Sequence, residues 1–151
     1  MTVEDLIAKH EGSSPVIYND SMGIPTIGIG HNLNASSLPA GMTPPLTSAQ
    51  ISQLFQTDLS GVMKDLTNNM PWFSSLDTVR QAVLIDMDFN MGWPTLSQFV
   101  NTLAMVKAGN YAGAAAGMLD STWATQVPGR AQEDSKMMSS GLWPDDPNFP
   151  A

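Results

Sequence analysis

Two carboxylates near the start of the chain, Glu11 and Asp20, are nine positions apart. A carboxyl group that keeps its proton can donate it to a leaving oxygen, and an ionised carboxylate can activate a water molecule. Thr26 follows in the same stretch, and its hydroxyl could help to hold that water. Hydrolysis of a glycosidic bond needs this set of groups. The spacing alone is weak evidence, because 14 Asp and Glu among 151 residues make such pairs common.

The surrounding sequence predicts the elements that position these side chains. Residues 2–11 predict a short amphipathic helix with Glu11 in its last turn, where the negative end of the helix dipole favours a protonated carboxyl group. Residues 16–30 combine β-branched residues with Gly and turn residues, which predicts a small antiparallel sheet. We expect Asp20 on its turn and Thr26 on its second strand.

The rest of the chain predicts a helical body. Its central helix is expected to start at Ser74 or Ser75, is apolar nearly all round as helices at the centre of a lobe usually are, and ends before Gly92-Trp93-Pro94. One further helix is expected after Pro94, over residues 95–109. Residues 32–46 are rich in Pro, Ser, Gly and Asn and predict a loop, after which apolar residues recur at helical spacing. The fold class expected is therefore α+β, mainly helical, with a small N-terminal β-sheet lobe and a larger helical lobe in a single domain. The expected divisions are an N-terminal helix, a β lobe with its loop, a connecting helix, a helical lobe and a tail, over 1–12, 13–46, 47–66, 67–143 and 144–151.

Composition and charge exclude several classes of function. The net charge of −8, with only six Lys and Arg, leaves no basic stripe to neutralise the phosphates of a nucleic acid. No segment has the roughly 18 apolar residues that a membrane span requires. The start of the chain lacks the pattern of a secretory signal, so we expect synthesis in a cytoplasm. Two His and no Cys make a metal site improbable, and we expect a monomer that needs no cofactor.

The stretch from Glu11 to His31 resembles the active-site signature of the phage-type lysozymes, glycoside hydrolase family 24. Ten positions among these 21 residues match the pattern: Glu11, Gly12, Tyr18, Asp20, Gly23, Thr26, Ile27, Gly28, Gly30 and His31. Three later segments also resemble helical segments of T-even-type phage lysozymes: LDTVRQAVLIDMDFNMG, FVNTLAMVKAGNYAGAA and STWATQVPGRA.

This resemblance implies the two-lobed lysozyme fold and a muramidase activity on bacterial peptidoglycan. The bond cut would be the β-1,4 bond between N-acetylmuramic acid and N-acetylglucosamine. Glu11 would protonate the leaving oxygen, and Asp20 with Thr26 would direct a water at the anomeric carbon from the opposite face, which inverts its configuration. The phage setting implies an endolysin that is made in the host cytoplasm and acts on the periplasmic cell wall after release.

The resemblance also implies a second set of site residues. Phe89 and Asn90 match a saccharide-binding element in which Asn90 replaces a frequent Gln, and Thr102 matches a hydroxyl of the substrate cleft. His31 would have a structural role near the cleft, with an ion pair to a carboxylate of the helical lobe as one option. Arg130 matches an arginine near the acid, although a surface cation is the alternative.

Two other classes of function compete with the muramidase. A lytic transglycosylase needs the acid but no water-directing base, so the presence of Asp20 and Thr26 disfavours it. A non-catalytic wall-binding module would typically have lost one of the two carboxylates, and both are present. A virion-borne muramidase and a secreted effector also remain open, because a net charge of −8 opposes approach to an anionic cell wall.

Overall fold

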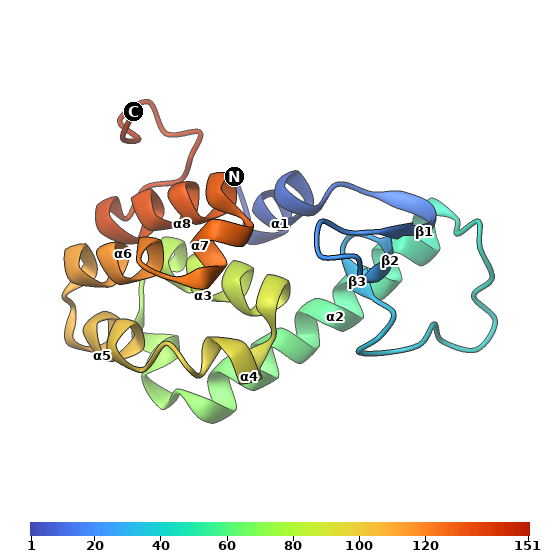
Figure 1. Ribbon diagram of the computed structural model, residues 1–151, viewed down its shortest axis with the longest axis horizontal. Helices are drawn as coiled ribbons and strands as arrows, with labels where there is room; N and C mark the ends of the chain where they lie inside the picture. The colour runs from blue at the N-terminus through green and yellow to red at the C-terminus, as the bar shows by residue number, and fades with distance from the viewer. The chain divides into compact units, whose positions relative to one another are not determined.

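A computed structural model describes all residues of the chain, 1–151, as a mainly helical α+β protein. The chain divides into two compact units, which we call the sheet unit and the helical unit. The sheet unit comprises Glu4–Gly61, and the helical unit comprises Met1–Val3 with Val62–Ala151. The fold class expected from the sequence is therefore confirmed (Figure 1).

The sheet unit begins with one helix and a three-stranded antiparallel sheet of order β1-β2-β3. The bounds of these elements are α1 Val3–Glu11, β1 Ser14–Asn19, β2 Pro25–Gly28 and β3 His31–Asn32. α1 ends because Gly12 adopts a left-handed conformation (φ +68°), and its N–H donates to the carbonyl of Ala8. The helix predicted over residues 2–11 thus forms one residue shorter, and the predicted sheet extends slightly beyond 16–30.

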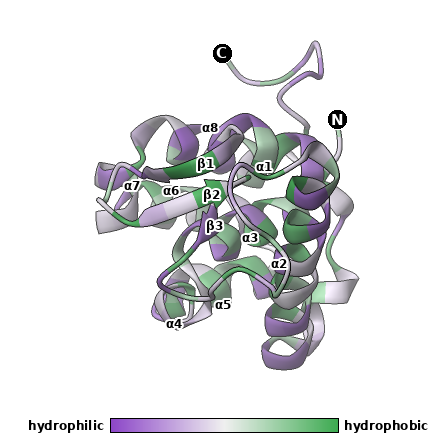
Figure 2. Ribbon diagram, turned by 90° about the vertical axis from the view of Figure 1, so that its right-hand side faces the viewer, coloured by the Kyte–Doolittle hydropathy of each residue, from purple (hydrophilic) through white to green (hydrophobic).

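The core of the sheet unit is small and draws on the long loop. Ile27 of β2, Leu46 of the loop and Leu54 of the following helix are buried together. The Pro-rich loop is anchored to this cluster by its few apolar side chains. Those that pack against the cluster are Leu33, Leu38 and Met42. The edge strand β1 exposes Val16 and Ile17, and part of its ribbon has the hydrophobic colour (Figure 2).

The boundary between the two units falls inside the long helix α2, Ser48–Asn69. The 3₁₀ helix η1 and six α-helices follow it in the helical unit. Their bounds are η1 Pro71–Ser75, α3 Thr78–Met91, α4 Trp93–Leu96, α5 Val100–Ala108, α6 Tyr111–Leu119, α7 Thr122–Gln126 and α8 Pro128–Ser140. Within this unit α6 packs between α5 and α8 (Figure 1).

Two helix boundaries differ from the sequence-based expectation. The central helix was expected to start at Ser74 or Ser75, but it starts at Thr78, because Asp77 caps it and accepts the N–H of Arg80. The segment after Pro94 was expected to form one helix, yet it forms α4 and α5. The two helices are separate because the backbone is not helical at Phe99, the residue before α5, where ψ is +52°.

α3 is the centre of the helical unit, as its apolar sequence predicts. Val83, Leu84 and Met87 are fully buried. Asp86 and Asp88 are buried as well, with exposures of 0% and 2%. Residues two positions apart on a helix point in different directions, so each of these carboxyl groups faces different surroundings.

Candidate active site

Glu11 lies in the last turn of α1, and its carboxyl group lies against Gly30. A Cβ atom added to Gly30 would lie 2.7 Å from the carboxyl carbon of Glu11 and 2.8 Å from its Oε2. Gly30 also has a φ of +65°, which favours glycine. The tight turn between β2 and β3 therefore leaves room for the Glu11 carboxyl group only because no side chain occupies position 30.

Asp20 is held by the turn between β1 and β2. Its Oδ1 accepts the N–H of Met22 at 2.8 Å and the N–H of Ile24 at 2.9 Å. Its own N–H donates to the carbonyl of Ile24. Both turn bonds use Oδ1, so the carboxylate is fixed in orientation while Oδ2 takes no part in the turn.

Thr26 is buried on β2, with 3% of its surface exposed. Its hydroxyl donates to the carbonyl of Ile24 at 2.8 Å, so it can act toward other groups only as an acceptor. Ile24 thereby bonds to both Asp20 and Thr26, through its N–H and its carbonyl. The turn brings these two predicted residues together through one shared residue.

Tyr18 of β1 lies under the influence of both carboxylates. It pairs with Thr26 in the register of β1 and β2. Its pKa is raised above the ordinary value, first by burial and then by the negative charges of Glu11 and Asp20. Both carboxylates therefore act on one phenol. The sequence pattern contained Tyr18, but no role was predicted for it.

His31 bridges the strand β3 to α2 and the loop. Its Nδ1 lies 2.7 Å from Oδ2 of Asp58, and its Nε2 lies 2.8 Å from the carbonyl oxygen of Ser36. Both ring nitrogens face acceptors, which favours the doubly protonated ring. The pKa of His31 is raised, mainly by its hydrogen bond to Asp58 and against the opposing effect of burial. The ion-pair partner is thus Asp58 of α2, in the sheet unit, and not a carboxylate of the helical unit.

We expect Asp58→Asn to destabilise the protein in a pH-dependent way. Because the folded state raises the pKa of His31, the ion pair contributes fully below the unfolded value of about 6.5 and is lost as pH rises through the folded value. The free energy of unfolding should fall by about 3 kcal/mol at pH 5 and by a clearly smaller amount at pH 9. Denaturant unfolding of both proteins at the two pH values measures it, and an equal loss at both would contradict the charged pair.

Asn90 and Phe89 lie at the end of α3 in the helical unit. The side-chain carbonyl of Asn90 accepts the indole N–H of Trp123 at 2.7 Å. Because Trp123 is buried, this bond sets the orientation of the amide and leaves its NH₂ group as a donor. Phe89 is half-buried beside it. Asn90 therefore presents donors, and Trp123 is a supporting residue that the sequence interpretation had not singled out.

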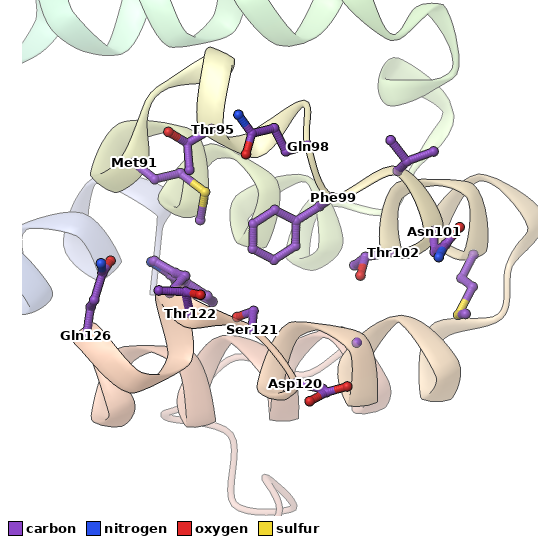
Figure 3. Close-up of a pocket in the computed structure, with 14 residues that line it drawn as sticks. Met91, Thr95, Gln98, Phe99, Asn101, Thr102, Asp120, Ser121, Thr122 and Gln126 are labelled. Atoms are coloured by element: carbon purple, nitrogen blue, oxygen red, sulfur yellow. The ribbon is translucent and has the colours of Figure 1, made fainter.

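A groove of about 720 Å³ lies within the helical unit, between α4, α5 and the segment joining α6 to α7. Thr102 and Trp123 both line it, and the Phe99 ring lies at its centre (Figure 3). Position 117 is Gly, where a Cβ would lie 2.5 Å from the Thr102 hydroxyl oxygen. The small residue leaves Thr102, otherwise buried, at the wall of the groove.

Arg130 of α8 is buried, with an exposure of 8%, so the alternative of a surface cation is wrong. Its Nε and one terminal nitrogen donate to the two carboxylate oxygens of Asp86, at 2.9 and 2.8 Å. Asp134 lies near this pair and is fully buried. Burial, followed by the charge of Asp86, raises the pKa of Asp134 well above its usual value.

Comparison with known proteins decides the family. The model of the family described as phage lysozyme matches residues 8–136, which is most of the chain. The chain belongs to the phage lysozyme family. Members of this family are peptidoglycan hydrolases, so the resemblance found in the sequence is confirmed. No helix of this family member is both long and apolar enough to cross a membrane.

Individual relatives of this phage lysozyme come from cells and from phages. The probable T4-type lysozyme 1 of Dictyostelium discoideum is 29% identical over 93% of this chain and 95% of its own length. The peptidoglycan hydrolase gp36 of Pseudomonas phage phiKMV is 29% identical over 88% of this chain but only 14% of its own length. The endolysin of Salmonella phage P22 is 40% identical over 37% of this chain and 38% of its own length.

The eight site residues expected from the sequence fall into two groups in this phage lysozyme. The sheet unit holds Glu11, Asp20, Thr26 and His31. The helical unit holds Phe89, Asn90, Thr102 and Arg130. The roles of all eight in binding and catalysis remain predictions.

Proposed function

We propose that this phage lysozyme is a muramidase that hydrolyses the β-1,4 bond between N-acetylmuramic acid and N-acetylglucosamine. The observation that carries the proposal is the turn that fixes Asp20 and Thr26 through the backbone of Ile24. A transglycosylase has no use for a positioned water, whereas a hydrolase depends on one.

The hydrogen bonds of the turn suit the activation of a water molecule. The Thr26 hydroxyl donates its hydrogen to the carbonyl of Ile24, so toward a water its oxygen can only accept a hydrogen bond. Asp20 keeps Oδ2 outside the turn as a second acceptor. A water that donates to both oxygens would have a lone pair directed away from them, toward the anomeric carbon. Asp20 would take its proton as the water attacks.

Glu11 is the proposed general acid. Its carboxyl group, against Gly30, would protonate the glycosidic oxygen as the bond to the anomeric carbon breaks. The water would add from the opposite face, which gives inversion of configuration.

The helical unit would supply binding groups for the polymer. The free NH₂ group of Asn90 suits the acetamido carbonyl oxygens of amino sugars, and Phe89 offers an apolar ring beside it. The groove lined by Thr102 offers hydroxyl, amide and apolar groups, which suit saccharide and peptide alike. Arg130 would act by holding α3 and α8 together through Asp86.

Product analysis tests this proposal. Purified peptidoglycan digested by the enzyme should yield fragments with reducing muramic acid ends, detected by mass spectrometry as products that have gained one water per cleaved bond. Proton NMR during early digestion should show the inverted anomer first. Anhydro-muramyl ends would instead identify a transglycosylase, and binding to peptidoglycan without any cleavage would identify a wall-binding module.

A further inference from the structure

Asp88 of α3 is a buried acid without a cation. Its exposure is 2%, and its Oδ2 is shielded from solvent with no donor within hydrogen-bond reach. Neither Asp88 nor its neighbour Asp65 takes part in an ion pair. An ionised carboxylate in such a place is strongly unfavourable, because nothing replaces its hydration. Because no cation compensates a negative charge here, the structure favours an Asp88 carboxyl group that keeps its proton.

The charged group that acts on Asp88 is a second carboxyl, that of Asp65 on α2, which lies within hydrogen-bond reach of it. Asp65 is partly exposed, whereas Asp88 is buried. Two ionised carboxylates are both acceptors and cannot bond to each other, but one shared proton makes one of them a donor. Burial, followed by the charge of Asp65 and a hydrogen bond with it, raises the pKa of Asp88 to about 7. No other charged group contributes to this shift.

We propose that Asp65 and Asp88 share one proton and that this carboxyl–carboxylate pair, which links α2 to α3, makes the helical unit an acid-stabilised fold. The shared proton is the only donor available between the two groups. Losing it leaves two like charges in contact, one of them buried, and this weakens the attachment of α3 to α2.

The direction of the pH effect follows from the two states of the chain. An aspartate in the unfolded chain has a pKa of about 3.9, and Asp88 in the folded protein has a pKa of about 7. Between these pH values the folded protein binds a proton that the unfolded chain has released. The contribution of this pair to stability is therefore highest below about pH 4, falls as pH rises toward 7, and changes little at higher pH.

The decisive variant is Asp88→Asn. Its amide has nearly the shape of the carboxylic acid and can donate to Asp65 at every pH. The test is thermal unfolding of the full chain at pH 5 and at pH 8. The Tm of the wild type should fall between these pH values by roughly 5 °C more than the Tm of Asp88→Asn. Asp65→Asn removes the charge of Asp65 but leaves Asp88 buried, so it should flatten the wild-type dependence only in part. His31 and Asp58 contribute equally in all these proteins and cancel in the comparison.

Asp120→Asn is the matched control. It removes the same charge from an exposed aspartate of the helical unit that makes no side-chain hydrogen bond, so it should retain the wild-type dependence on pH. A second measurement covers the case in which Asp88→Asn does not fold. Carbon NMR of the Asp88 carboxyl in the wild type should show a titration near pH 7.

A carboxyl titration of Asp88 near pH 4, or an Asp88→Asn variant with the wild-type dependence on pH, would overturn the shared proton. Neither experiment uses substrate, so the result does not depend on the proposed muramidase activity.

Discussion

Replacing Glu11 by glutamine is expected to reduce peptidoglycan hydrolysis about 1,000-fold, within the range that general acid–base catalysis typically supplies. The amide has the size of the carboxyl group that lies against Gly30, but it cannot protonate the leaving oxygen. The measurement is the loss of turbidity of outer-membrane-permeabilised Gram-negative cells, or of purified peptidoglycan. Thermal unfolding of the same protein should show that the fold is retained.

Two further variants make the Glu11 result specific. Glu4→Gln removes a carboxylate from the first turn of the same helix and should leave activity within about twofold, because only a helix-end charge worth roughly a few tenths of a kcal/mol is lost. Asp20→Asn keeps an oxygen for the N–H groups of Met22 and Ile24 and should be as inactive as Glu11→Gln. Clearing that survives Glu11→Gln would mean that the acid lies elsewhere.

Gly30→Ala should inactivate the enzyme through geometry. The new Cβ would lie 2.7 Å from the carboxyl carbon of Glu11, so the acid must move. Misplacement of a catalytic group by about 1 Å costs roughly 100-fold in rate, and we expect a loss of that size. The left-handed φ of +65° adds about 1–2 kcal/mol of destabilisation. Turbidity loss and thermal unfolding measure the two effects separately.

Gly12→Ala is the control for the cost of placing alanine in a left-handed backbone conformation. Gly12 has nearly the same φ, +68°, and ends the same helix that carries Glu11, but a Cβ there meets no atom within 4 Å. It should lose stability to a similar extent and keep most of its activity. Equal activities of the two alanine variants would show that contact with Gly30 does not position Glu11.

Much of this protein could be predicted from local sequence. The acid pair, Thr26 and the glycines between Glu11 and His31 lie within 21 residues, and their pattern by itself indicates the family. The mainly helical body also followed from apolar periodicity. Hydrophobic spacing and turn residues encode such features because they act between positions that are close along the chain.

Helix boundaries were less predictable, because competing local signals had to be decided by the chain around them. Ser74, Ser75 and Asp77 are all good helix caps, and only the structure shows that the first two fall in a 3₁₀ turn while Asp77 caps α3. The single helix expected after Pro94 divides in the same way.

The partners of the buried polar groups were decided by tertiary structure alone. Three such pairs join residues more than 20 positions apart: His31 with Asp58, Asn90 with Trp123, and Arg130 with Asp86. No local pattern specifies such a pairing, because it depends on which faces of two helices or strands meet. The pair of Asp65 and Asp88 is the clearest case, since each resembles an ordinary helix-surface acid in the sequence. Only the tertiary structure removes Asp88 from water, and the proposed shared proton is then the group that joins the two carboxyls.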